Sequence, residues 1–105
     1  MTRFAFQLRL RVDQIQAYEA AHREVWPELL SLLKQVGVEH YSIFRRGVDL
    51  FFYMQVPDFE RAWNEIDNSP VNQRWQDKMT ALFEPPADLQ PGERFPMMRE
   101  IFFLE

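Results

Sequence analysis

His22 is the side chain of this sequence best suited to move a proton near neutral pH. An unperturbed imidazole has a pKa of about 6.5, so it can act as a general acid or a general base. Tyr18 precedes it by four residues, and residues four apart in a helix lie on the same face. The spacing therefore predicts an imidazole beside a phenol. The alternative interpretation is a core histidine that only hydrogen-bonds a backbone carbonyl, because buried polar groups usually have such a partner.

Three further side chains could bind a small ring-shaped ligand. Tyr41 belongs to an expected strand and could face either side of its sheet, while Trp75 and Gln76 are neighbours in an expected helix. An indole can stack on the apolar C–H face of a sugar, and an adjacent carboxamide can hydrogen-bond the sugar hydroxyls. Each residue also has a purely structural interpretation, as a packing tyrosine, a core tryptophan or a surface glutamine.

The composition argues against several classes of partner. The chain has 105 residues, a net charge of −4 and no cysteine. Binding to nucleic acid or to an anionic membrane surface requires clustered basic side chains, which this acidic balance does not favour. Without cysteine there is no disulfide and no thiolate nucleophile. No stretch approaches the roughly 20 apolar residues of a membrane span, and no secretory signal is visible. We therefore expect a cytoplasmic protein that binds neither nucleic acid nor membrane.

The motifs that usually hold cofactors and metals are also missing from the sequence. The three glycines are scattered and form no phosphate-binding loop. The two histidines have no metal-ligand spacing, and no pair of acidic residues stands out as a glycosidase dyad. We expect chemistry without a metal or a cofactor, based on histidine, tyrosine and tryptophan, with a carboxylate as a further candidate.

Hydrophobic periodicity predicts the elements that must position these side chains. Alternation predicts strands, a spacing of three or four predicts helices, and Asp13 is the expected N-cap of the first helix. Pro27 lies inside that helix and predicts a kink or a restart near Trp26. Asp58 and Pro70 are expected to begin the two later helices. The expected strands cover residues 4–12, 38–46, 48–56 and 97–104, and the expected helices residues 13–36, 58–66 and 70–82, with an irregular loop over 84–96.

The order of these elements, β-α-β-β-α-β, predicts an α+β ferredoxin-like fold with a four-stranded antiparallel sheet and helices on one face. We expect residues 1–105 to form a single domain. The strand over residues 48–56 is apolar on both faces, with Phe51 and Tyr53 on the face away from the helices. A second copy of the chain is the simplest cover for that face, so we expect a homodimer of the dimeric α/β-barrel type.

Three segments of the chain resemble the L-rhamnose mutarotase family. They are residues 22–29 (HREVWPEL) with Tyr18 ahead of them, residues 41–43 (YSI), and residues 73–75 (QRW) followed by Met79. They occur in the order and at the separations typical of that family. The resemblance covers roughly residues 3–83 and the closing strand.

The resemblance implies a dimeric, cofactor-free enzyme that interconverts the α and β anomers of L-rhamnose or a related 6-deoxy pyranose. It implies that His22 is the proton donor and that Tyr18, Tyr41 and Trp75 contact the sugar. Family members commonly have two adjacent tryptophans, whereas the second position here is Gln76, so the identity of the sugar is an open point. The alternatives are a ferredoxin-like dimeric monooxygenase, acting on an aromatic substrate or with haem, and a sugar-binding module without catalysis.

Overall fold

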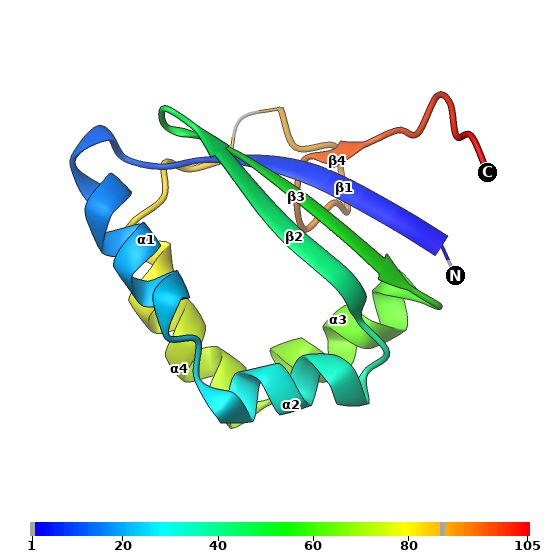
Figure 1. Ribbon diagram of the computed structural model, residues 1–105, viewed down its shortest axis with the longest axis horizontal. Helices are drawn as coiled ribbons and strands as arrows, with labels where there is room; N and C mark the ends of the chain where they lie inside the picture. The colour runs from blue at the N-terminus through cyan, green and yellow to red at the C-terminus, as the bar shows by residue number, and fades with distance from the viewer. Residues whose placement is uncertain (1, 87) are drawn as a thin grey trace.

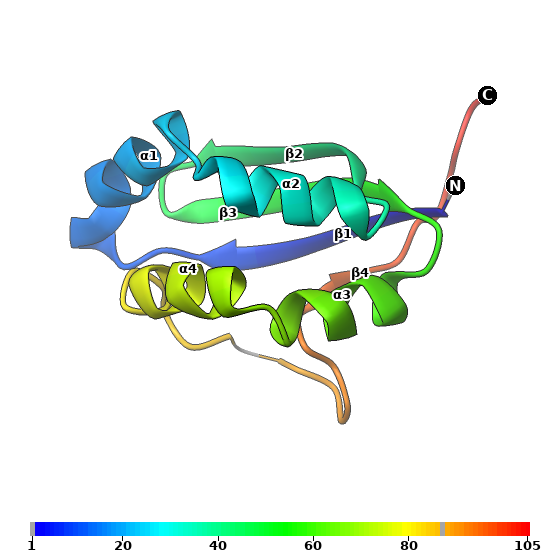
Figure 2. The ribbon, with the colours of Figure 1, turned by 90° about the horizontal axis from the view of Figure 1, so that it is seen from below.

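The computed structural model describes residues 2–86 and 88–105 and has the expected α+β architecture. Its antiparallel sheet has the order β2-β3-β1-β4, and the helices cover one of its faces (Figures 1 and 2). The strands are β1 (Thr2–Arg9), β2 (Glu39–Arg46), β3 (Asp49–Val56) and β4 (Met97–Met98). The helices are α1 (Ile15–Arg23), α2 (Pro27–Gln35), α3 (Phe59–Asp67) and α4 (Pro70–Thr80), with a 3₁₀ turn η1 (Val12–Gln14) before α1. The predicted fold class is confirmed.

The break in the first helical region confirms the effect expected of Pro27. The helix α1 ends at Arg23, and α2 begins with Pro27 in its first position, where the missing N–H costs nothing. The predicted cap at Asp13 is wrong, because this residue lies inside the 3₁₀ turn and α1 begins only at Ile15. Two short helices therefore replace one long one, and they run in different directions on either side of the break (Figure 1).

The later helices begin where the sequence predicts. Asp58 caps α3 by accepting a hydrogen bond of 3.1 Å from the backbone N–H of Arg61, and Pro70 occupies the first position of α4. Gly37, after α2, has a φ of +91°, and a Cβ at this position would lie 3.1 Å from the Cδ atom of Pro57. This position therefore needs glycine for both its backbone conformation and its packing.

The last strand differs most from the expectation. The segment expected to form a strand over 97–104 pairs with β1 only at Met97 and Met98. Beyond Met98 this segment contacts β1 through side chains. The guanidinium of Arg3 binds the carboxylate of Glu100 at 2.7 and 2.8 Å and lies 3.4 Å from the ring centre of Phe103. The chain end then leaves the sheet, and its apolar side chains are exposed (Figure 1).

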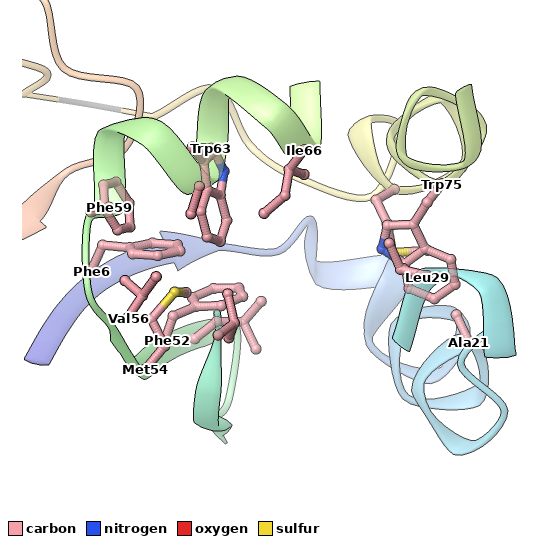
Figure 3. Packing of buried hydrophobic residues seen from close by; sticks show 14 of the residues in the cluster. Phe6, Ala21, Leu29, Phe52, Met54, Val56, Phe59, Trp63, Ile66 and Trp75 are labelled. Carbon is pink, nitrogen blue, oxygen red and sulfur yellow. The ribbon is translucent and has the colours of Figure 1, made fainter. Parts of the chain in front are cut away.

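The buried hydrophobic side chains form one cluster, and Figure 3 shows two parts of it. One lies where α3 packs on β1 and β3, and it includes Trp63 and Ile66. The other lies where α1, α2 and α4 meet, and it includes Leu29 and Trp75. Members of both parts line one cavity.

Candidate active site

A cavity of about 370 Å³ lies between the sheet and the helices. Its volume falls within the range of roughly 300–1,000 Å³ that is usual for small-molecule sites. The wall is mostly aliphatic and aromatic, with a few polar side chains contributed by α1, β2 and α4. The lining residues are His22, Val25, Leu29, Leu30, Leu33, Tyr41, Ile43, Trp63, Ile66, Asn72, Trp75 and Gln76.

The imidazole of His22 is held in this wall by three neighbouring groups. Its Nδ1 atom lies 2.9 Å from the backbone oxygen of Tyr18, one helical turn earlier. Its ring centre lies 4.2 Å from the ring centre of Tyr18 and 5.4 Å from that of Trp75, which it meets edge-on at 80°. The predicted pairing of Tyr18 and His22 on one helix face is confirmed. The alternative of a histidine bonded to a backbone carbonyl is also observed, and in the same residue that lines the cavity.

The protonation state of His22 follows from this environment. A carbonyl oxygen can only accept, so Nδ1 carries the proton that binds the Tyr18 oxygen. In the neutral ring Nε2 is then the unprotonated nitrogen. Burial lowers the pKa of His22, and the bond to the Tyr18 oxygen opposes this effect only in part. The imidazole is therefore neutral at pH 7 and can act as a base at Nε2.

Tyr18, which is buried, and Tyr41, which is half-buried, both line a smaller recess of about 80 Å³ that His22 also lines. Tyr41 faces the helices, which settles the choice that the sequence left open. Burial raises the pKa of both phenols, and the proximity of Tyr41 raises the pKa of Tyr18 further. Both side chains are therefore neutral phenols at pH 7, able to donate hydrogen bonds but not to serve as bases.

The tryptophan expected to contact a ligand, Trp75, lines the cavity from α4. Trp75 is buried, and its indole meets His22 on one side and Trp26 on another, the latter at 5.1 Å between ring centres. Gln76 is exposed and lines the same cavity, so it lies at the rim. The structure thus brings together all five side chains that the sequence predicts for the site: His22, Tyr18, Tyr41, Trp75 and Gln76.

Asn72 is the polar lining residue that sequence reasoning missed. It is 5 % exposed and is the buried polar residue of the described core. It lies one helical turn before Gln76, so the same spacing rule that paired Tyr18 with His22 would have found it.

The sequence left open a role for a carboxylate in the chemistry of the site. In the described ranges 2–86 and 88–105, no Asp or Glu lines the cavity or its recess. Within those same ranges, no three His, Asp or Glu side chains lie close enough to hold a metal ion. The groups available for proton transfer are therefore one imidazole and two phenols.

Comparison with known proteins gives the family of the chain. A family model described as L-rhamnose mutarotase matches residues 3–104. The chain belongs to the L-rhamnose mutarotase family. It is 32% identical to the L-rhamnose mutarotase of Bacillus subtilis (strain 168) over 107 residues, and 34% identical to that of Yersinia pestis (strain Pestoides F) over 106 residues, with 100% of each chain covered. The isomerase class predicted from the sequence is thereby confirmed.

Solved structures show the same fold. The crystal structure of an L-rhamnose mutarotase from Formosa agariphila superposes with a TM-score of 0.77 at 30% identity, and 100% of each chain is covered. A tetracenomycin F2 cyclase from Streptomyces glaucescens superposes with a TM-score of 0.75 at 17% identity, over 100% of this chain and 98% of that one. The second likeness concerns the fold alone. Among the described residues, no helix is long and apolar enough to span a membrane.

Proposed function

We propose that this member of the L-rhamnose mutarotase family interconverts the α and β anomers of L-rhamnose or a related 6-deoxy pyranose, with His22 as the group that transfers the proton. The observation that carries the proposal is the position of His22. Its ring lines an otherwise largely apolar cavity, and its Nδ1 atom is already bonded to the backbone oxygen of Tyr18. Nε2 is therefore the nitrogen left for a ligand.

Ring opening of a pyranose needs one proton removed from the hydroxyl on C1 and one delivered to the ring oxygen O5. Neutral His22 can take the first proton at Nε2 while the C1–O5 bond breaks and C1 becomes an aldehyde carbon. The imidazolium then donates this proton to O5. Both oxygens are bonded to C1, so a single nitrogen can reach each of them in turn. Rotation about C1–C2 and reclosure give the other anomer, with no net change in protons or electrons.

This sequence of steps explains how His22 can be a proton donor although it is neutral at rest. It acquires the proton from the substrate and returns it in the same opening step. The neutral phenols of Tyr18 and Tyr41 are suited to donate hydrogen bonds to sugar oxygens beside the imidazole. Positioned acid–base groups typically contribute 10²–10⁴-fold to a rate, and His22 would supply that factor here.

The residues that line the cavity indicate how the sugar would bind. We propose that Trp75 stacks against the apolar face of the sugar and that Gln76 hydrogen-bonds a hydroxyl at the rim. The aliphatic side chains of α2 in the lining, such as Leu29 and Leu33, offer a surface for the C6 methyl group. A cavity with polar groups at one part of its wall and aliphatic groups at another suits a 6-deoxy sugar.

We also propose that the chain acts as a cytoplasmic homodimer. The sheet face opposite the helices carries Phe44 and Phe51, a cross-strand pair with exposed fractions of 61% and 37%. Exposed aromatic side chains on a sheet favour a protein partner, and a second copy with the same surface would cover them. The lack of cysteine suits a reducing compartment.

Saturation transfer in proton NMR tests the proposed activity. One anomeric signal of L-rhamnose is irradiated at equilibrium, with and without protein, and we expect transfer to the other anomer that a His22→Ala variant no longer gives. Transfer with L-fucose but not L-rhamnose would keep the mechanism and change the substrate. Binding without transfer would favour a sugar-binding module, and no effect with any sugar of a panel would refute the proposed function.

A further inference from the structure

Asn72 is a buried carboxamide that has no hydrogen-bond partner among the described residues. Its side chain forms no hydrogen bond with any other residue of the ranges 2–86 and 88–105, unlike the nearby amides of Asn68 and Gln73, which donate to backbone oxygens at 2.9 and 3.3 Å. A carboxamide that is removed from bulk water without a hydrogen-bond partner destabilises the fold. An unpaired carboxamide in a core is therefore a feature that requires an explanation.

The side chain of Asn72 lines the cavity. Among the described residues, no side-chain nitrogen or oxygen is both sealed from solvent and without a hydrogen-bond partner. The unpaired atoms of Asn72 must therefore retain an accessible surface, and the space that Asn72 lines is the cavity that also contains His22. A ligand in this cavity would meet a donor and an acceptor at one point of the α4 wall.

The residues around Asn72 restrict the kind of ligand group that can bind its carboxamide. Neighbouring lining residues Trp63, Ile66 and Leu33 are apolar, and no charged side chain of the described chain belongs to the lining. A neutral group that both donates and accepts, namely a hydroxyl, matches a carboxamide in such an environment. A charged group of the ligand would find no counter-ion there.

We propose that Asn72 is a specificity-determining residue that binds one ring hydroxyl of the sugar. This inference rests on the proposed function and deepens it. With Asn72 at the buried end and Gln76 at the rim, two carboxamides on successive turns of α4 select sugars that present hydroxyls to this helix. The apolar remainder of the wall selects against a further hydroxyl at C6.

The test compares Asn72→Leu with a matched Asn64→Leu variant, because Asn64 is exposed on α3 and does not line the cavity. Leucine has the same number and branching of side-chain heavy atoms as asparagine but is bulkier and cannot hydrogen-bond. We expect Asn72→Leu to raise the KM for L-rhamnose in the exchange assay by about tenfold, with kcat changed by less than about threefold. The Kd from quenching of tryptophan fluorescence should rise by the same factor. Asn64→Leu should leave all three values unchanged.

A purely structural role for Asn72 would give a different pattern. Replacing an unpaired buried amide by leucine should not lower the thermal midpoint, and a fall in midpoint with unchanged KM would overturn the proposal. If Asn72→Leu does not fold, Asn72→Ala carries the same expectations for KM and Kd.

Analogues of L-rhamnose that each lack one ring hydroxyl identify the contact. The unmodified protein should bind one of the 2-, 3- and 4-deoxy analogues about tenfold more weakly than L-rhamnose, and Asn72→Leu should bind that analogue and L-rhamnose equally. If both proteins discriminate among the analogues in the same way, the role of Asn72 is overturned while the proposed function still stands. Absence of exchange and of sugar binding in the unmodified protein overturns the proposed function as well, and it is visible before any variant is made.

Discussion

Replacing His22 by asparagine separates its chemistry from its position in the fold. The Nδ2 atom of asparagine can occupy about the same place as Nδ1 of histidine, so the hydrogen bond to the backbone oxygen of Tyr18, which is 2.9 Å long in the structure, can be kept. The nitrogen that faces the ligand, Nε2, is removed. Alanine would remove both, and its effect would mix catalysis with stability.

The expected magnitudes follow from the contacts of the imidazole. Loss of a positioned acid–base group should slow anomer exchange by 10²–10⁴-fold, which corresponds to about 2.7–5.4 kcal/mol in the activation barrier. The fold should lose the packing of part of the ring against Tyr18 and Trp75, on the order of 1 kcal/mol. In a domain of this size this is a fall of roughly 4–8 °C in the thermal midpoint.

The assay measures exchange by saturation transfer and folding by thermal denaturation on the same samples. His40→Asn is the matched control, because His40 is exposed, lies outside the lining of the cavity with His22 and has a φ of +50° that asparagine tolerates. It should exchange L-rhamnose at the unmodified rate. Exchange by His22→Asn within a factor of ten of the unmodified protein would refute the role assigned to Nε2.

Three more predictions concern pH, the backbone and assembly. Since burial lowers the pKa of His22, kcat/KM should rise with pH to a plateau, with its midpoint below 6.5. The free energy of unfolding should fall as pH drops below 6.5, because the unfolded chain binds the proton more tightly. His22→Asn should abolish this dependence in a denaturant titration. Gly37→Ala should lower the free energy of unfolding by roughly 2–4 kcal/mol, because of strain at φ +91° and crowding of Pro57. Gly47→Ala should lower it by about 1–2 kcal/mol, because a Cβ there meets nothing. Equal losses in the two variants would contradict the packing argument. Phe51→Glu should convert a dimer to a monomer by light scattering, and an unchanged mass would remove this face from the interface.

Most of the local structure could be predicted because its causes lie within a few residues. Alternation predicts β3 and the inner face of β1, Pro27 divides the first helical region, and Asp58 begins α3. The pairing of Tyr18 with His22 belongs to the same class, since one helical turn determines it. The true end of the last strand after Met98 could not be read from the pattern, because a strand ends where its partner stops pairing, and that depends on β1.

The chemistry of the site depended on the tertiary structure. The sequence alone supplies the side chains His22, Tyr41 and Asn72, but a pKa is shifted by the atoms that exclude water around a group, and these come from distant segments. Burial makes His22 a neutral base at rest and keeps Tyr41 a neutral phenol. The same burial leaves Asn72 unpaired beside a cavity. Residue types and helical spacing were determined locally, whereas protonation states and unmet hydrogen bonds were decided by which surfaces the sheet and the helices remove from water.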